Sequence, residues 1–200
     1  LLCEYIENML MGDQSAQCVS GVGYLPMPQP AINVQFYLMQ IAQVIEKIGY
    51  MPLNQDGFVI YVEKSPAAIS VAESEQIPKE ISYKMISYNH HSMRGKLQEK
   101  KNTILKLAEL LEAKRTELAK VDSRFCSDIF YLFNNLNILH NNVDPSINGK
   151  FKQAVADMPP EELDHWYDES YQMCLLAFLR LEQADRKIEF DKLKSVIEST

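Results

Sequence analysis

Apolar residues recur at helical spacing through most of this 200-residue chain. The longest predicted helix covers residues 92–119. Its apolar stripe consists of Leu97, Ile104, Leu107, Ala108 and Leu111. A stripe of this kind, with Lys and Glu opposite, is typical of a helix that packs on a core. The chain has only 7 Gly, which disfavours a turn-dense all-β fold. The sequence therefore predicts a mainly α protein, a helical bundle with one small β-hairpin near residues 50–62.

The hairpin is predicted from two apolar runs, at residues 50–53 and 58–62, on either side of Asp56-Gly57. Asp-Gly between β-branched and aromatic residues is a hairpin signal. Pro52 cannot donate a ladder hydrogen bond, so we expect the first strand to lie at an edge. Because two strands alone are marginally stable, the hairpin must lean on helices.

Three segments organise the chain. Residues 1–30 contain a short helix and a loop rich in Pro and Gly from residue 12 onward, and residues 31–78 contain a helix and the hairpin. The helix at 31–48 has Ile32, Phe36, Met39, Val44 and Ile48 near helical spacing. Residues 79–200 form the helical bundle. Ser65-Pro66 predicts a helix start, with Ser as N-cap and Pro in the first turn.

Charge and cysteine usage restrict the class of protein. The net charge of −7 disfavours a protein whose main task is to bind nucleic-acid phosphates. The four cysteines are scattered without a C-x-x-C pair, so the sequence predicts no metal, no cofactor and reduced thiols in the cytoplasm. We expect no membrane span, since the apolar runs are far shorter than ~20 residues. No signal-peptide pattern is visible, and Leu1 indicates that the natural start lies upstream.

The stretch at residues 130–142 combines aromatic residues with amides and an imidazole. A helix is predicted from residue 122 or 123 to about residue 140, which would bring several of these polar groups onto one face. Buried amides cost free energy unless they are bonded, so they form either a structural patch that fixes the next loop or a functional site. The candidates are His140 as a catalytic residue and Asn134, Asn135, Asn137 and Asn141 as binding residues.

Two other polar clusters have a structural and a functional interpretation. His90-His91 could contact a phosphate or ligand, or could mark a helix junction with surface histidines, which we favour. Trp166 lies in an aromatic-rich segment that could form a contact surface. We expect it instead to lie on the core-facing stripe of the last long helix, because a single Trp beside Tyr is more often buried.

The segment from Asn134 to His140 resembles the motif of HEPN domains, which have an Arg, a polar residue and then a His a few residues later. Asn135 matches the polar residue and His140 the His, while Asn134 stands in place of the Arg. The resemblance covers residues 79–198. The preceding helix and hairpin look like segments that precede such domains in bacterial abortive-infection proteins.

The resemblance implies a helical fold in which the His moves a proton and the Arg stabilises phosphate charge. Asn134 has no positive charge for that role, so weak or absent nuclease activity is implied. Such domains often dimerise with their motif faces together. We therefore expect a non-catalytic interaction or dimerisation module with a homodimer or protein partner, in bacterial defence or stress. The alternatives are a metal-independent ribonuclease using His140 and a nucleotide-binding domain, with RNA or nucleotide as ligand.

Overall fold

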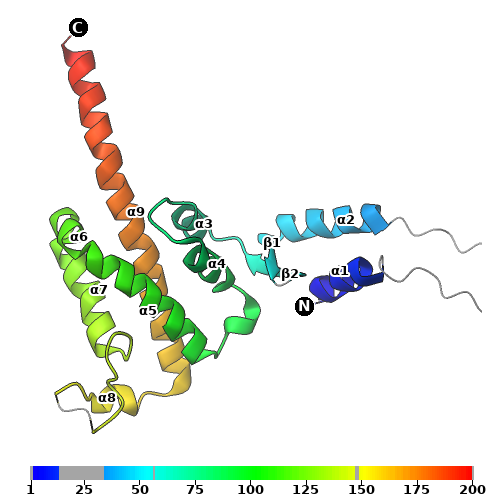
Figure 1. The fold of residues 1–200 in the computed structure, drawn as a ribbon, viewed down its shortest axis with the longest axis horizontal. Helices are drawn as coiled ribbons and strands as arrows, with labels where there is room; N and C mark the ends of the chain where they lie inside the picture. Colours follow the sequence, from blue (N-terminus) through cyan, green and yellow to red (C-terminus); the bar gives the residue numbers. More distant parts are fainter. Residues whose placement is uncertain (1, 14–33, 56, 147–148, 200) are drawn as a thin grey trace, which may run out of the picture. The chain divides into compact units, whose positions relative to one another are not determined.

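The computed structural model describes residues 2–13, 34–55, 57–146 and 149–199 (Figure 1). The chain divides into two compact units, Leu1–Lys64 and Ser65–Thr200. The described residues are mainly helical and contain one two-stranded antiparallel sheet, which confirms the predicted fold class. Most of the predicted loop at residues 12–30 lies outside the described residues.

The first unit contains two helices and the hairpin. Its elements are α1 (Leu2–Asp13), α2 (Val34–Lys47), β1 (Tyr50–Gln55) and β2 (Phe58–Glu63). Tyr50 pairs with Glu63 and Gln55 with Phe58, as expected for a hairpin whose strands are joined at the predicted position, and Asp56 lies outside the described residues. Gly57 has a φ of +87°, a backbone conformation that glycine adopts without steric cost.

Side chains of α1 cover the free edge of β2. The Asn8 amide donates to the Val59 carbonyl at 2.9 Å and accepts from the Val59 N–H at 2.8 Å. A Glu4 carboxylate oxygen accepts from the Tyr61 N–H at 2.8 Å, and the Tyr61 hydroxyl donates to Glu7. Unpaired edge groups are a template for aggregation, so α1 protects the strand. Burial and the Glu7 carboxylate raise the pKa of Tyr61.

The apolar residues that predicted a helix at 31–48 do not lie in the core, and Ile32 lies outside the described residues. Phe36, Met39, Val44 and Ile48 are exposed, whereas Ile45 is buried with Val59 and Tyr61. Val44 and Ile45 are adjacent and lie about 100° apart around the helix axis. A shift of one residue is therefore enough to bring a different apolar residue onto the hairpin.

The second unit is a bundle of helices around α9. Its elements are α3 (Pro66–Ala72), α4 (Lys79–Ser87), the 3-10 turn η1 (His91–Met93), α5 (Leu97–Ala113), α6 (Arg115–Val121), α7 (Ser123–Asn135), α8 (Gln153–Ala156) and α9 (Pro160–Glu198). α5 packs along α9, and α3, α6 and α7 also contact it (Figure 1). The core contains Ile104, Leu107 and Phe178, all buried. Since α3 packs on α4 and α9, it belongs with this bundle.

Local sequence signals explain the helix boundaries here. The Ser65 hydroxyl accepts from the Ala68 N–H at 3.3 Å and Pro66 occupies the first turn, as predicted for α3. The predicted helix at 92–119 is wrong as a single element, because Gly95 has a φ of +74° and α5 begins only at Leu97. A second break at Lys114, with φ −107° and ψ 9°, separates α5 from α6.

Trp166 does not belong to the core as predicted. Its side chain is 38% exposed, while the neighbouring Tyr167 is buried. Tyr167 lies on the face of α9 that includes Tyr171, Cys174 and Phe178, at the helical spacing of a core stripe. The helical phase, and not the size of the indole ring, determines which of the two neighbours is buried.

Candidate functional site

The predicted polar face at residues 134–141 is not a helical face. α7 ends at Asn135, five residues before the predicted end at His140. Asn137 has a φ of +56°, and Asn is among the few residues that tolerate this left-handed conformation. The helix was predicted to extend beyond Asn135 because Ile138 and Leu139 continue the apolar pattern. Ile138 is indeed buried, but it belongs to the loop that follows α7.

The first two amides of this segment bond to their own helix. Asn134 Nδ2 donates to the Phe130 carbonyl and Asn135 Nδ2 to the Tyr131 carbonyl, both at 2.8 Å. Side-chain bonds of this kind compete with the helical ladder and are frequent near helix ends. The amide that stands in place of the family's Arg is therefore engaged in local structure.

The next amides hold the loop. Asn137 N–H donates to Asn142 Oδ1 at 2.8 Å, and Asn142 N–H donates to Asn137 Oδ1 at 3.3 Å. Asn142 is fully buried, and its Nδ2 donates to the Lys150 carbonyl at 2.7 Å. Burial raises the pKa of Tyr167 to about 12, although a side-chain hydrogen bond with Asn137 lowers it. This network favours the structural interpretation for Asn137, and Asn142 is a member that the predicted site lacked.

His140 and Asn141 follow in the loop. Asn141 is exposed, and its Oδ1 accepts from the Val143 N–H at 3.3 Å in a local turn. His140 is half-buried and makes no hydrogen bond or ion pair with the residues that the structure describes. The structure thus divides the predicted site residues between a helix end, a buried loop network and one imidazole.

A buried ion-pair network around Lys100 was not predicted from the sequence. Lys100 is only 3% exposed, and its Nζ lies 2.8 Å from both Asp164 Oδ1 and Asp168 Oδ1. The Tyr88 hydroxyl donates to Asp168 at 2.9 Å, and its ring stacks on Tyr171 with centroids 3.9 Å apart. Burial, together with the Asp168 carboxylate, raises the pKa of Tyr88. The network fastens α4 and α5 to α9.

A sequence signal for this network exists. Lys100 falls at helical spacing with Ile104, Leu107 and Leu111, and a lysine on an apolar stripe requires an anion. Asp164 and Asp168 lie four residues apart, so they share a face of α9. The network is structural in type, since it satisfies its charges within the unit.

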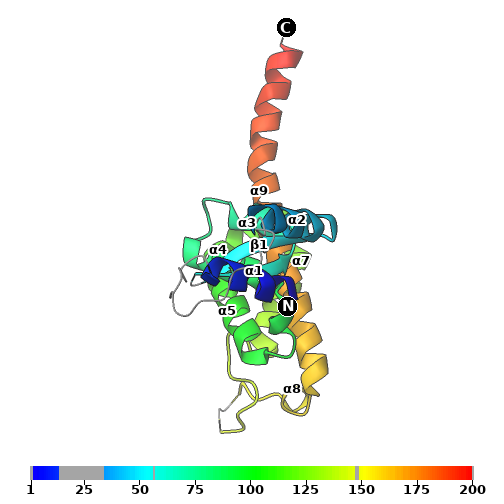
Figure 2. The ribbon, with the colours of Figure 1, turned by 90° about the vertical axis from the view of Figure 1, so that its right-hand side faces the viewer.

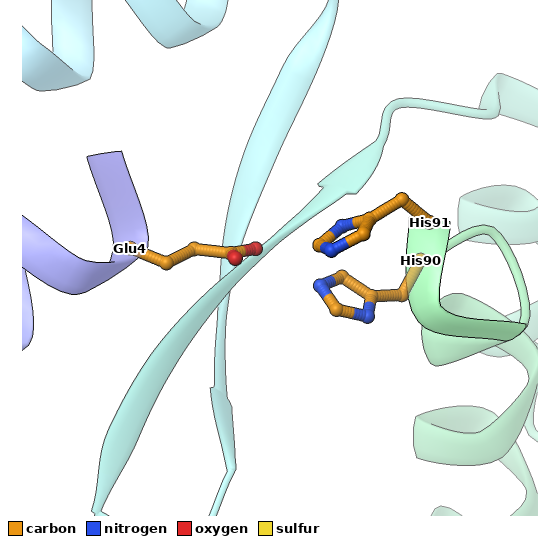
Figure 3. A group of neighbouring side chains, drawn as sticks. All are labelled: Glu4, His90 and His91. Atoms are coloured by element: carbon orange, nitrogen blue, oxygen red, sulfur yellow. The ribbon is translucent and has the colours of Figure 1, made fainter. Parts of the chain in front are cut away.

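His90 and His91 mark a helix junction. Figure 3 shows their rings side by side, with centroids 4.1 Å apart. His90 Nδ1 accepts from the Ser92 N–H at 3.4 Å and so caps η1, the short turn between α4 and α5. This geometry agrees with the interpretation of the pair as a junction.

An exposed apolar surface lies on α9. The last buried residue of this helix is Leu181, and beyond it the helix extends past the other helices of the unit (Figures 1 and 2). Five large apolar side chains are more than half exposed there: Ile188 at 58%, and a group of four that consists of Phe190 61%, Leu193 56%, Val196 64% and Ile197 66%. Clustered apolar exposure of this kind makes a candidate interaction surface. We call these four residues the α9 patch.

The α9 patch is not a membrane span. Among the described residues, no helix combines the length and apolar character needed to cross a bilayer. The patch residues alternate with charged ones, including Glu189, Asp191, Lys192 and Lys194.

Comparison with known proteins gives no relative from which a role could be transferred. No protein-family model, no curated protein and no solved structure matches this chain.

Proposed function

We propose that this chain is a non-catalytic helical interaction module that associates with a second protein chain through the α9 patch. The proposal rests on one observation, the exposed apolar residues of the α9 patch, which lie on α9 beyond its last buried residue, Leu181. Covering such residues removes apolar surface from water, which is the main driving force of protein association. The predicted homodimer or protein partner is therefore assigned to α9, and not to the motif segment.

The proposed cellular context rests on the resemblance to HEPN domains and on two buried cysteine thiols. HEPN-like domains of bacterial abortive-infection proteins act in defence or stress, and we propose the same context here. Cys126 and Cys174 are buried free thiols, which supports a reducing, cytoplasmic location.

The ribonuclease alternative is supported by His140 alone. Its imidazole is half-buried without a partner in the described segments, so it is available to a ligand. Against this role, Asn134 supplies no positive charge and its amide is bonded to Phe130. Without the positive charge that the family's Arg supplies, a phosphorane would lose several kcal/mol of stabilisation.

The test combines light scattering after size exclusion with an RNA-cleavage assay on the same sample. We expect self-association that Leu193→Asp abolishes, because a buried carboxylate in an apolar interface is strongly unfavourable. Ile188→Asp is the matched control, since Ile188 is 58% exposed on the same helix but lies about 140° from Leu193. Association that survives Leu193→Asp, or RNA cleavage that requires His140, would contradict the proposal.

A further inference from the structure

The exposed face of α9 has a heptad repeat. Spacings of three and four residues connect a seam that consists of Leu176, Leu179, Gln183, Arg186, Phe190, Leu193 and Ile197. Alternating spacings of three and four are the pattern of the a and d positions in a coiled coil. In this register Phe190 and Ile197 occupy a positions, and Leu193 a d position.

The seam lies at and beyond the margin of the core, and only Leu179 of its apolar members packs against the core. Leu176 is 41% exposed and Leu179 is half-buried, whereas the neighbouring Leu175 and Phe178 are buried. The seam therefore starts at the margin of the core, with Leu176 exposed, and continues into the α9 patch. A second helix could lie along the patch without displacing any core residue of this unit.

The charges beside the seam select an orientation. Glu182 and Glu189 occupy g positions, and Lys187 and Lys194 occupy e positions. In a parallel coiled coil, a g residue faces the e residue five positions later in the other helix, so Glu189 would face Lys194 of the second copy. An antiparallel pair would bring e positions together, and lysine would face lysine.

The ion pairs within α9 leave Glu189, Lys187 and Lys194 able to pair with charges on a second helix. Glu182 is bonded to Arg186 at 3.3 Å, and Lys194 lies 3.6 Å from Glu198. The second contact is exposed, and such pairs within one helix are worth only about 0.3–0.5 kcal/mol. Glu189 and Lys187 have no ion pair with the described residues. The Glu189–Lys194 pair between copies is therefore the clearest electrostatic determinant.

We propose that the α9 patch binds a second copy of this chain as a short, parallel, in-register coiled coil over residues 183–197. This inference rests on the proposed function, because it names the partner of the same surface. The bundle holds the first half of α9, so the helix is formed before association and its nucleation cost is already met. Gln183 at an a position and Arg186 at a d position weaken the pair but fix its register.

A charge-reversal cycle tests the orientation. Sedimentation equilibrium of the full chain should show a dimer whose association constant falls about tenfold in Glu189→Lys, since two attractive pairs become repulsive. Adding Lys194→Glu to that variant should restore association. Lys192→Glu is the matched control, because Lys192 lies on the same helix at a c position, away from the seam.

Cysteine cross-linking provides a second, independent measurement. Phe190→Cys and Ile197→Cys are oxidised separately, with the unsubstituted chain as background for the native thiols. Both variants should form disulfides between identical positions. The two sites lie about 10 Å apart along the helix, so an antiparallel pair could join at most one of them to itself.

The outcomes separate this inference from the proposed function. A chain that stays monomeric at the highest concentration overturns the coiled coil between copies, together with the self-association expected under the proposed function. A different result would overturn only the parallel arrangement. In that case Leu193→Asp would disrupt the dimer, Glu189→Lys would leave its association constant unchanged, and disulfides would form only in a mixture of the two cysteine variants. The proposed interaction module would then still hold.

Discussion

The two halves of α9 are parts of one helix, yet only the first is covered by the rest of its unit. Residues 160–181 bury Tyr171, Leu175 and Phe178 against the bundle, whereas residues 182–198 bury none. Both halves have large apolar side chains at helical spacing. The contrast teaches that a periodic pattern specifies a helix and its stripe, but not which chain covers that stripe.

The largest expected effect is a difference between the two halves of α9 in how much a buried or exposed side chain contributes to the free energy of unfolding. Phe178→Ala should lower the free energy of unfolding by about 3–5 kcal/mol, and Leu107→Ala by about 2–5 kcal/mol, through lost burial and cavity formation. Phe190→Ala in dilute protein should change it by less than about 0.5 kcal/mol, since that ring is exposed. Urea unfolding measures all three. Equal losses at Phe178 and Phe190 would remove the distinction between the halves.

Lys100→Met tests how the first half of α9 is attached to the rest of the bundle. The substitution keeps the length of the side chain but leaves Asp164 and Asp168 without their shared cation. Breaking a buried pair in this way costs about 3–5 kcal/mol.

The control for that substitution is Lys106→Met. Lys106 pairs with Glu109 at 2.9 Å on the surface, and exposed pairs are worth at most about 1 kcal/mol. Denaturant midpoints that shift equally in the two variants would show that the buried network does not fasten α5 to α9.

The ion pair between Asp122 and Arg180, close to where the two halves of α9 meet, should make the stability of the fold depend on pH. The Phe125 N–H, together with Arg180 at 2.6 Å, lowers the pKa of Asp122. A lowered folded pKa gives stability that is present above the unfolded value and is lost as the pH falls through the folded one. The difference in melting temperature between the unsubstituted chain and Asp122→Asn should therefore shrink as the pH falls below the ordinary pKa of an aspartate, about 3.9. A difference independent of pH would show that the carboxylate charge does not contribute.

The smallest expected effect is at His140. Because the imidazole has no partner in the described segments, His140→Ala should change the melting temperature little and leave self-association through α9 intact. A large loss of stability would instead show a structural histidine whose bonded groups were left unsatisfied.

Short-range signals predicted much of the fold. Asp56-Gly57 gave the hairpin, and Ser65-Pro66 gave the start of α3, because each has a local physical cause. The end of α7 was not predictable in this way. Asn137 ends the helix through bonds to Asn142, and that contact exists only once the loop has folded.

The candidate site was less predictable than the fold. The amides in the motif segment stood out by composition, yet two bond to their own helix and one to the loop. Periodicity alone did not show that the α9 patch is exposed, because Phe190 and Phe178 look alike in sequence. Only the surrounding helices decide which of them is covered.

Hydrogen exchange at several protein concentrations tests most directly whether the second half of α9 is an interaction surface. At low concentration, the amides of residues 183–198 should exchange quickly, while those of residues 165–181 stay protected by the bundle. Raising the concentration should slow exchange in the second half alone, because association covers the α9 patch. Exchange in residues 183–198 that is the same at every concentration would contradict an interface between copies of this chain.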